Sequence, residues 1–581
     1  MKTTKQLIFL LGAITCFFLL SCERDSDLIS ETDTEVETDD DSDNIGDHDE
    51  STDYIWDSTD IVTITLNGSS ISVNGDGATA SGSKVTITAA GTYSVSGTLT
   101  DGQIVVDTDD ETIVRLILNG VDISCSSNAP IYIEDAEKAM IVLADDTENK
   151  VADGSSYSSD EEDANAAIFS KIDLTLYGDG TLVVTGNYND GITSKDGMII
   201  SGGNISVTAV DDGIRGKDYL IINNGNITVD CGGNGLKSDN ADDEGRGYIT
   251  INDGTIDITA VGDAIDAEKE VMVVTGNLDL TSGGGNNAYL SSDASAKGIK
   301  SGTSSQFIGG TITVNSADDA IHSDGDIEIS GGTFYLASGD DGIHAEADLT
   351  ISSGDIYITD AYEGLESALG SITITDGYIN IIASDDGINV SAGGTTSGGG
   401  TGRKSASVTS DYALIISGGY IVIDCEGDGL DSNDLLDISG GTQLVNSDST
   451  TENSSLDYDG TCVVSGGFLV GVGSSRMSMA PGSSSSQYSF LIDFSSSLSA
   501  GKIIRIQDSE GNEILTYEPH KTFQSLVFSS SKLTKGTTYE VYIGGSSSGI
   551  ATDGLYSSGT YTGGTKYSQF TISSMVTSID L

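Results

Sequence analysis

The chain is poor in proline, cysteine, histidine, tryptophan and positive charge. Its 581 residues include only 3 prolines, 6 cysteines, 4 histidines and 1 tryptophan, and 25 lysines and arginines stand against 90 aspartates and glutamates. The resulting net charge of −65 excludes duplex nucleic acid as a partner, because phosphate binding needs clustered Lys and Arg. No Cys-x-x-Cys or Cys/His zinc spacing is present. With 74 glycines and almost no proline, the turns must be made with Gly, Asn and Asp.

The first 22 residues predict a signal peptide rather than part of the fold. Lys2 and Lys5 are followed by the apolar run Leu7–Leu20, which is too short for a comfortable membrane span. The run ends in Leu-Leu-Ser-Cys, which resembles a bacterial lipobox and implies cleavage before Cys22 and lipid attachment to its sulfur. The alternative is an ordinary secretory signal with an incidental cysteine.

Residues 23–60 predict an acidic, disordered tether. They contain many aspartates and glutamates and almost no aliphatic residues, so they should stay solvated and repel one another. The acidic residues directly after Cys22 resemble the surface-export signal of Bacteroidetes lipoproteins. We therefore expect an outer-membrane lipoprotein at the cell surface, monomeric and touching the membrane only through its lipid; the alternative is a tether held in the periplasm.

The tetrapeptide Asp-Asp-Gly-Ile returns along the rest of the chain. It stands at Asp211–Ile214, Asp340–Ile343 and Asp385–Ile388, with close variants between and after these copies. The Gly or Ala of the motif at positions 298, 320, 342, 364 and 387 recurs every 22 or 23 residues. A fixed period of this size is typical of a solenoid, in which each repeat packs on the next.

Each repeat predicts three short strands. In residues 340–362 the segments Ile-His-Ala, Leu-Thr-Ile and Ile-Tyr-Ile alternate apolar and polar residues, and Gly-containing turns separate them. The sequence therefore predicts an all-β protein with a parallel β-helix of about 22 residues per coil over 61–486. The period stops near Gln487, and residues 487–581 predict a small β-sandwich-like module that caps the open end.

The residues after the motif form two outward columns, which together we call the charged strip. The first column reads Thr193, Arg215, Lys237, Asp266, Lys300, His322, His344, Glu366, Asn389, Asp431 and Asp457; the second begins Lys195, Lys217, Asp239, Glu268. The candidate substrate-binding residues are the cations and histidines of this strip: Lys195, Arg215, Lys217, Lys237, Lys300, His322 and His344. The two histidines could also hold a metal or transfer protons, or they could be satisfied ladder side chains.

The bend before each Ile carries aspartates that would stack from coil to coil. Carboxylates about 5 Å apart repel unless they are neutralised, and Ca²⁺ with six to eight oxygen ligands would neutralise them. The candidate ligands are Asp211, Asp212, Asp239, Asp263, Asp266, Asp318, Asp319, Asp340, Asp341, Asp385 and Asp386. The alternative is that Asp suits the turn by hydrogen-bonding its own backbone.

Other side chains have simpler interpretations. Cys125, Cys231, Cys425 and Cys462 are too far apart along the stack to pair where their register is clear, and buried thiols are expected. Two outward tyrosine pairs, at 335 and 357 and at 378 and 420, could stack on sugars or could pack on one another.

Several stretches resemble a family of secreted bacterial carbohydrate-binding β-helix proteins that are related in fold to pectate lyases. They are Gly91–Val106, Leu118–Ile123, Ala166–Gly178 and Asp211–Asp218, and the resemblance extends over about 61–581. It implies a right-handed β-helix, Ca²⁺ between coils, and binding of polysaccharides, notably acidic ones such as polygalacturonate. It supplies no catalytic residues.

Three functions are consistent with these features. The first, which we prefer, is Ca²⁺-assisted binding of an acidic, pectin-like polysaccharide along the charged strip. The second is a Ca²⁺-dependent polysaccharide lyase in which Lys237, Lys300 or Arg215 removes the sugar C5 proton; such a base needs a lowered pKa, and the neighbouring carboxylates oppose that. The third is a structural surface adhesin.

Overall fold

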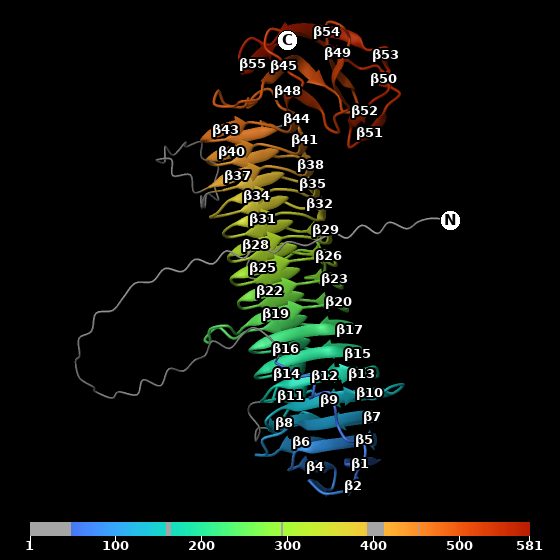
Figure 1. The fold of residues 1–581 in the computed structure, drawn as a ribbon. Coiled ribbons are helices and arrows are strands. Elements are labelled where there is room, and N and C mark those ends of the chain that lie inside the picture. The colour runs from blue at the N-terminus through green and yellow to red at the C-terminus, as the bar shows by residue number, and fades with distance from the viewer. Residues whose placement is uncertain (1–47, 159–163, 292–293, 392–411, 451) are drawn as a thin grey trace, which may run out of the picture. The chain divides into compact units, whose positions relative to one another are not determined.

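The computed structural model describes residues 48–158, 164–291, 294–391, 412–450 and 452–581. Within these ranges the protein is all-β and contains no helix (Figure 1). No described helix is therefore long and apolar enough to cross a membrane. The predicted signal peptide, the lipidation residue Cys22 and the tether up to residue 47 lie outside the described residues, as do parts of the loops near 282–297 and 391–410.

Two long sheets account for most of residues 61–473, and Figure 1 shows their strands stacked one above another along one axis. The sixteen-stranded sheet consists of β3 (Ala78–Ser81), β4 (Lys84–Ile87), β6 (Gln103–Asp107), β8 (Ile131–Asp135), β11 (Ala166–Ser170), β14 (Asp190–Ser194), β16 (Ile214–Gly216), β18 (Leu236–Ser238), β21 (Ile265–Ala267), β24 (Ile299–Ser301), β27 (Ile321–Ser323), β30 (Ile343–Ala345), β33 (Leu365–Ser367), β36 (Ile388–Val390), β39 (Leu430–Ser432) and β42 (Leu456–Tyr458).

The thirty-one-stranded sheet consists of β1 (Ile61–Gly68), β2 (Ile71–Asn74), β5 (Gly91–Leu99), β7 (Val114–Cys125), β9 (Ala139–Leu143), β10 (Glu148–Asp153), β12 (Leu174–Gly178), β13 (Thr181–Gly186), β15 (Gly197–Ala209), β17 (Tyr219–Cys231), β19 (Tyr248–Ile251), β20 (Thr255–Ala260), β22 (Glu270–Val273), β23 (Asn277–Ser282), β25 (Ser304–Phe307), β26 (Thr311–Ser316), β28 (Asp326–Ile329), β29 (Thr333–Ser338), β31 (Leu349–Ile351), β32 (Asp355–Asp360), β34 (Ile372–Ile374), β35 (Tyr378–Ala383), β37 (Ala413–Ile416), β38 (Tyr420–Cys425), β40 (Leu435–Ile438), β41 (Thr442–Ser447), β43 (Thr461–Val464), β44 (Phe468–Gly473), β45 (Ser489–Leu498), β48 (Phe523–Ser530) and β55 (Val576–Asp580).

The strands repeat in sets of three along the chain, and we call each set a coil. In one coil β30 lies in the sixteen-stranded sheet, and β31 and β32 lie in the thirty-one-stranded sheet. Parallel pairing places Ile299 beside Ile321, Ile321 beside Ile343, and Ile343 beside Leu365, so successive coils pair at a step of 22 residues. The predicted period is thus the step by which one coil hydrogen-bonds to the next.

The apolar members of the alternating strands fill the space between the sheets. Ile321, Ile343 and Leu365 are completely buried, as are Leu349, Ile351 and their counterparts in neighbouring coils. Full burial of one such side chain stabilises the fold by about 1.5–3 kcal/mol, so the continuous column is the main source of cohesion between coils. The cysteines at 125, 231, 425 and 462 are free and buried, which confirms the prediction of unpaired thiols.

Antiparallel strands pair with the first parallel strand of each sheet and with the last parallel strand of the thirty-one-stranded sheet. At the start, β2 pairs antiparallel with β1, and β3 pairs antiparallel with β4 in the other sheet. At the end, β48 pairs antiparallel with β44. An exposed parallel edge would offer unpaired N–H and C=O groups to other chains, and these strands occupy those groups.

The last part of the predicted tether is not free. Tyr54 packs on Tyr177 with ring centroids 4.7 Å apart, and Trp56 joins the same apolar cluster. Arg115 Nε donates to the carbonyl oxygen of Asp53 at 2.9 Å, and Lys138 pairs with Asp49. The expectation of disorder through residue 60 is therefore wrong for this segment, because its aromatic residues find an apolar surface on the stack.

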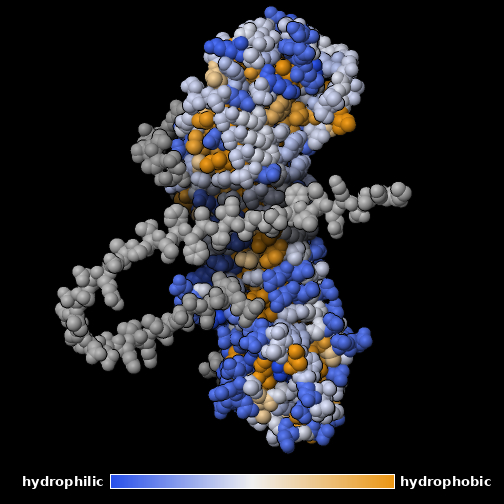
Figure 2. All heavy atoms as spheres, viewed as in Figure 1, coloured by the Kyte–Doolittle hydropathy of each residue, from blue (hydrophilic) through white to orange (hydrophobic). Residues whose placement is uncertain are grey.

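The C-terminal residues form a second core. A six-stranded antiparallel sheet contains β46 (Ile504–Asp508), β47 (Glu513–Tyr517), β49 (Thr538–Ile543), β51 (Ile550–Thr552), β52 (Leu555–Ser557) and β54 (Thr565–Thr571), and a small sheet contains β50 (Ser546–Ser547) and β53 (Tyr561–Thr562). Buried Phe490, Phe523, Phe528 and Tyr517 pack with Val470 of the last coil. The surface facing the viewer in Figure 2 is mostly hydrophilic, with hydrophobic patches, some of them over this C-terminal module.

Candidate functional site

The charged strip forms a continuous column on the sixteen-stranded sheet. Parallel pairing joins Arg215 to Lys237, Lys237 to Asp266 and Asp266 to Lys300, and the same register continues through both histidines to Asp457. The predicted order of the first column is therefore confirmed. Most of its side chains are half-buried rather than fully exposed.

The start of the column departs from the expectation. Thr193 is completely buried, and its hydroxyl donates to Asp190 Oδ2 at 2.9 Å. Its partner in the preceding coil is the buried Phe169, which belongs to an apolar cluster on the outer side of the sheet. Thr193 therefore faces outward as predicted but is not exposed, because the apolar cluster covers the sheet at this level.

The bend aspartates bind the backbone of the next coil. Asp212 Oδ1 accepts the N–H of Asn234 at 2.9 Å, Asp319 Oδ1 accepts the N–H of Asp341 at 3.0 Å, and Asp386 Oδ1 accepts the N–H of Asp428 at 2.6 Å. Each oxygen satisfies a donor 22 or 42 residues later along the chain, so these aspartates hold neighbouring coils together. For these three aspartates the bonded backbone belongs to the next coil rather than to the local turn, whereas Asp318 Oδ1 accepts the N–H of the adjacent Asp319 at 3.1 Å, as the turn interpretation predicts.

The second oxygen of these aspartates faces the charged strip. Asp212 Oδ2 accepts from Lys237 Nζ at 3.0 Å, and Asp263 Oδ2 lies 3.8 Å from Lys300 Nζ. Lys300 Nζ also lies 3.6 Å from Asp266 Oδ1. The repulsion among stacked carboxylates is thus relieved in these coils by the protein's own ammonium groups.

Arg215 makes the most specific ion pair of the strip. Its guanidinium donates to both oxygens of Asp239, with Nη2 at 2.9 Å from Oδ1 and 2.7 Å from Oδ2. A charge-assisted pair with two bonds from one nitrogen fixes the orientation of both groups. Asp239 was predicted to bind Ca²⁺, and in this structure it orients Arg215.

The other two predicted cations differ from these. Lys195 Nζ lies 5.8 Å from the centroid of the Phe169 ring. Lys217 is half-buried and, over the described ranges, forms no ion pair. Lys217 is therefore the predicted cation that keeps its charge uncompensated by a direct contact.

Lys297 is a cation that the sequence analysis missed. It occupies the bend position that is Asp in most other coils, and its Nζ lies 3.0 Å from Asp318 Oδ1 and 2.6 Å from Asp319 Oδ2. The signal was present in the sequence, since Lys297 precedes the motif Gly298 directly. Lys297 falls in the bend column rather than in the two columns after the motif that make up the charged strip.

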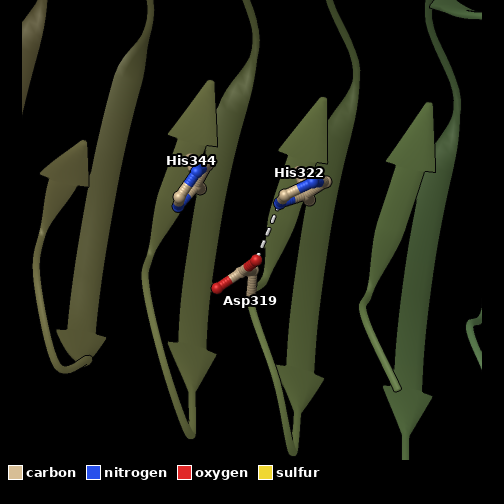
Figure 3. A group of neighbouring side chains, drawn as sticks. All are labelled: Asp319, His322 and His344. Carbon is tan, nitrogen blue, oxygen red and sulfur yellow. Dashed lines mark hydrogen bonds and ion pairs between the residues drawn. The ribbon is translucent and has the colours of Figure 1, made fainter. Parts of the chain in front are cut away.

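The two histidines stack on adjacent strands, as Figure 3 shows. The ring centroids of His322 and His344 are 4.8 Å apart. His322 Nδ1 lies 2.8 Å from Asp319 Oδ2, and His344 Nδ1 lies 2.9 Å from Asp341 Oδ2 and 2.8 Å from Glu366 Oε2. Both rings therefore point one nitrogen at the bend aspartate of their own coil.

These contacts decide the charge of His344. Burial would lower the pKa of His344, but the hydrogen bonds with Asp341 and Glu366 outweigh it and raise the pKa to about 11. For Glu366, burial raises the pKa, and the contact with His344 outweighs it, so the pKa of Glu366 is lowered. The positive charge of His344 therefore relieves the repulsion among the carboxylates at this level, as Lys237 and Lys300 do in earlier coils.

The lysines proposed as lyase bases hold their protons tightly. Burial lowers the pKa of Lys237, but attraction to Asp212 outweighs it and the pKa is raised. The pKa of Lys300 is likewise raised, because attraction to Asp266 and Asp263 outweighs burial. A general base at neutral pH needs the opposite shift.

Among the described residues, three groups of side chains place metal-ligand atoms within 4.8 Å of one another. They are Asp319, His322 and His344; Asp341, His344 and Glu366; and Asp318, Asp319 and Asp340. The third group offers only carboxylate oxygens, the donors that Ca²⁺ prefers, but Lys297 already contacts two of its members. All four aspartates of these groups, Asp318, Asp319, Asp340 and Asp341, belong to the predicted ligand set. Lys297, His322 and His344 compete with a metal ion for their oxygens.

The last coils of the strip carry carboxylates without a described ammonium or imidazolium beside them in the column. Burial and the charge of Asp428 raise the pKa of Asp386 to about 7, and burial raises the pKa of Asp428 to about 6. Burial and the charge of Asp386 raise the pKa of Asp431 well above its usual value. Asp428 and Asp431 were not among the predicted ligands, although Asp431 stands in the first column of the charged strip.

A buried amide lies beside these carboxylates. Asn389 is 8% exposed, and its Nδ2 donates to Glu363 Oε2 of the preceding coil at 2.9 Å. Its Oδ1 is buried and has no hydrogen-bond partner. Asn389 pairs with Asp431 in the parallel register between β36 and β39. The unpartnered amide oxygen therefore belongs to the same column as the carboxylates of the last coils. Asn389 Oδ1 and the carboxylates of Asp386, Asp428 and Asp431 are thus acceptors without a described cationic partner.

The tyrosines form one row rather than two separate pairs. Tyr335 stacks on Tyr357 at 5.3 Å, Tyr357 lies 5.4 Å from Tyr378, and Tyr378 stacks on Tyr420 at 5.7 Å between centroids. The row lies on the thirty-one-stranded sheet, away from the charged strip. Because the rings cover one another's faces, only the ends of the row can offer a face to a ligand.

Comparison with known proteins shows similarity to carbohydrate-binding domains. A family model described as "Carbohydrate-binding domain-containing protein" matches residues 81–342. A protein of Acetivibrio thermocellus with the same description is 44% identical over 137 residues, which are 23% of this chain and 48% of that protein. The chain thus spans about half the length of that relative.

A solved structure is also similar. Its title is "Structure of the polysaccharide lyase-like protein from C. thermocellum, Gadolinium derivative", with 32% sequence identity, a TM-score of 0.38, and coverage of 46% of this chain and 96% of that chain. The matched family region, 81–342, contains the cationic half of the charged strip.

Proposed function

We propose that the protein is a surface lipoprotein that binds an acidic polysaccharide along the charged strip of a right-handed parallel β-helix. The observation that carries this proposal is the match of residues 81–342 to a carbohydrate-binding domain, because that region contains Lys195, Arg215, Lys217, Lys237 and Lys300. A strip that continues without interruption from coil to coil suits a polymer, since successive sugars can meet equivalent positions.

The contacts suggest how an anionic chain binds to a protein of such negative net charge. Lys217 offers an ammonium that has no direct counter-ion among the described residues, and Arg215 beside it is held in place by Asp239. Local charge, not net charge, decides whether a carboxylate is attracted at short range. Glycan carboxylates would therefore bind at the level of these two residues.

Affinity gel electrophoresis with polygalacturonate tests this part of the proposal. Lys217→Ala should weaken binding by about ten-fold, the loss of one charge-assisted hydrogen bond. Lys150→Ala is the matched control, because Lys150 is exposed on the other sheet and pairs with Glu148. Equal retardation of both variants and the wild type would refute a glycan site at Lys217.

We further propose that Ca²⁺ binds at the acidic end of the strip. Asp386, Asp428 and Asp431 with Asn389 Oδ1 supply the oxygen donors, and a divalent cation there would lower the carboxyl pKa values that burial raises. The cation could also bridge the protein to a uronate carboxylate. The predicted ligands Asp385 and Asp386 belong to this end, whereas Asp212, Asp263 and Asp319 already have cationic partners.

Thermal unfolding tests the Ca²⁺ site. Addition of Ca²⁺ at 100 times its dissociation constant should stabilise the fold by about 2.7 kcal/mol, and a chelator should remove the effect. Asp386→Asn should abolish most of the shift in melting temperature, whereas Asp279→Asn, on an exposed position of β23, should not. A shift unchanged by Asp386→Asn would place the ion elsewhere or exclude it.

Polysaccharide lyase activity is the second candidate function. Polygalacturonate with Ca²⁺ would give unsaturated products that absorb near 235 nm. We favour binding because the raised pKa values of Lys237 and Lys300 make them poor bases. Product formation that Lys237→Ala or Lys300→Ala removes would reverse this preference.

We infer the lipid anchor and the surface location from the N-terminal sequence alone. Metabolic labelling with a radioactive fatty acid should label the wild type and not Cys22→Ser. Protease added to intact cells should release the protein if it is exposed at the surface, and should leave it intact if the tether keeps it in the periplasm.

A further inference from the structure

A cavity of about 620 Å³ lies where the last coils meet the C-terminal module. Its lining includes Tyr420, Thr442 and Phe468 from the coils, together with Lys532 and residues of the β51–β52 hairpin. The volume falls within the range of about 300–1,000 Å³ that is usual for small-molecule sites. The cavity belongs to the thirty-one-stranded sheet, whereas the charged strip belongs to the sixteen-stranded sheet.

The floor of the cavity is made by three successive coils. Tyr420 pairs with Thr442, and Thr442 pairs with Phe468, so the two aromatic residues stand two strand positions apart with a small side chain between them. Two strand spacings are about 9.6 Å. A sugar ring in van der Waals contact with an aromatic face needs about 4 Å on each side, so a single flat pyranose fits the gap over Thr442.

Tyr420 is the end of the tyrosine row, and it has a face to offer. One face of its ring is covered by Tyr378, whose ring lies 5.7 Å away at an interplanar angle of 7°. Its in-register neighbour in the next coil is Thr442, whose side chain is too short to cover a ring, and both residues line the cavity. Apolar faces of sugar rings pack on such aromatic faces, and the stack behind Tyr420 keeps its ring from rotating.

The hairpin of β51 and β52 adds the outer wall. The Tyr420 hydroxyl lies 3.5 Å from the Thr552 carbonyl oxygen, and the Tyr378 hydroxyl lies 3.4 Å from Asp553 Oδ2. These contacts hold the hairpin against the tyrosine row. Ser557 and Ser558 line the cavity from the same hairpin and present hydroxyl groups, which are the partners that sugar hydroxyls need.

A cation, Lys532, also lines the cavity. Lys532 Nζ lies 6.0 Å from the centroid of the Phe468 ring and donates to the Ile514 carbonyl oxygen at 3.3 Å. An ammonium has three N–H donors, so this contact leaves donors for a ligand. An acidic side chain, Glu513, also lines the cavity, but it is paired with Arg505. Lys532 therefore remains to attract a sugar that bears a carboxylate.

We propose that this cavity is a second glycan-binding site, which takes one acidic pyranose between Tyr420 and Phe468 with its carboxylate at Lys532. The sugar ring packs on Tyr420 over Thr442, and the hairpin covers it. The site lies outside residues 81–342 and is therefore independent of the matched carbohydrate-binding region. The chain would then have a binding site for an individual sugar ring in addition to the charged strip that binds the polymer.

Calorimetry with digalacturonate, a ligand too short to follow many coils, tests the proposal in the full-length protein. Thr442→Trp fills the gap and should abolish binding at the cavity, and Tyr420→Ala should weaken it at least ten-fold. Thr442→Ser keeps the gap and should bind as the wild type does. Tyr335→Ala, at the other end of the row, is the matched control, since Tyr335 is 46% exposed and does not line the cavity.

Lys532→Met tests the charge preference. It should weaken digalacturonate binding at least ten-fold while leaving binding of cellobiose, a neutral disaccharide, unchanged. Wild-type affinity for digalacturonate in both Thr442→Trp and Tyr420→Ala would overturn the proposal, provided that their melting temperatures match the wild type. Lys217→Ala separates the two sites. If it weakens polymer binding and leaves digalacturonate binding intact, the change acts on the charged strip alone. If Thr442→Trp abolishes digalacturonate binding and leaves polymer binding intact, that change acts on the cavity alone.

Discussion

The glycine of the Asp-Asp-Gly-Ile motif is required by packing rather than by its backbone angles, and this makes a quantitative prediction. A Cβ added at Gly342 would lie 2.6 Å from the Gly364 carbonyl oxygen and 2.8 Å from Ile358 Cδ1. The same clash recurs at the other motif glycines, each against a β-branched side chain of its own coil: Val207, Val229, Ile258, Val314, Ile381, Ile423 and Val445.

Two coils carry alanine instead of glycine at the motif position, and they show which facing side chain leaves room for a methyl group. Ala264 and Ala320 are completely buried. Sixteen residues after each of them stands Leu280 or Leu336, in the column where the glycine coils have Val or Ile. Leucine branches at Cγ rather than Cβ, which leaves room near the backbone for one methyl group. Glycine at the motif position therefore goes with a β-branched residue in the facing column, and alanine at the motif position goes with leucine there.

A double-mutant cycle tests this match. Gly342→Ala should destabilise the fold by about 2–3 kcal/mol, because overpacking a buried site costs about 1–3 kcal/mol and one of the close atoms belongs to the backbone. Ile358→Leu conserves volume and should cost about 1 kcal/mol. If Leu makes room for the methyl group, the double variant should cost at least about 1 kcal/mol less than the sum of the two single changes.

Urea unfolding followed by circular dichroism measures these free energies, with midpoints compared at equal slope. Leu336→Ile is the reciprocal control: it creates the crowded pair beside Ala320 and should cost more than Ile358→Leu. Additivity of Gly342→Ala and Ile358→Leu within about 0.5 kcal/mol would refute the reasoning, because distant, independent sites behave that way. In that case the carbonyl contact alone would explain the glycine.

Three further predictions concern other parts of the fold. The pKa of His344 is raised from 6.5 to about 11, so its stabilising charge is complete below about pH 6.5 and is lost as the pH rises towards 11; the melting temperature should fall over this range, and less steeply in His344→Gln. Asn149 is fully buried, and its Oδ1 accepts two backbone N–H groups, so Asn149→Leu should lower the free energy of unfolding by about 3 kcal/mol in urea titrations. The four buried cysteines should react with a thiol reagent only after unfolding, and a reducing agent should leave the melting temperature unchanged; faster reaction of the native protein would contradict their burial.

The sequence was sufficient for the features that depend on period and alternation. A spacing of 22 residues places Ile321 beside Ile343 and His322 beside His344, and the structure has this register. Strict alternation decides which residues face the core, since neighbouring side chains on a strand point to opposite sides. The strand repeat, the first column of the charged strip and the burial of the cysteines could therefore be read from the chain.

What the sequence could not supply was the pairing of charges across coils. Lys237 contacts Asp212 of the preceding coil, and Lys297 contacts Asp318 and Asp319 of the following one. These contacts depend on how far each flexible side chain reaches and on which partner lies there in space. The sequence shows an excess of carboxylates, but only the structure shows which of them already have a cation and which do not.

The period of the motif thus determined the stack, because hydrogen bonding between coils requires a constant step. Tertiary structure decided the role of each motif aspartate, because one oxygen binds the next coil's backbone and the other faces whichever cation that level provides. It also decided the cavity at Tyr420, which exists only because the C-terminal hairpin folds back on the last coils. A contact between residues more than 100 positions apart leaves no trace in local sequence patterns.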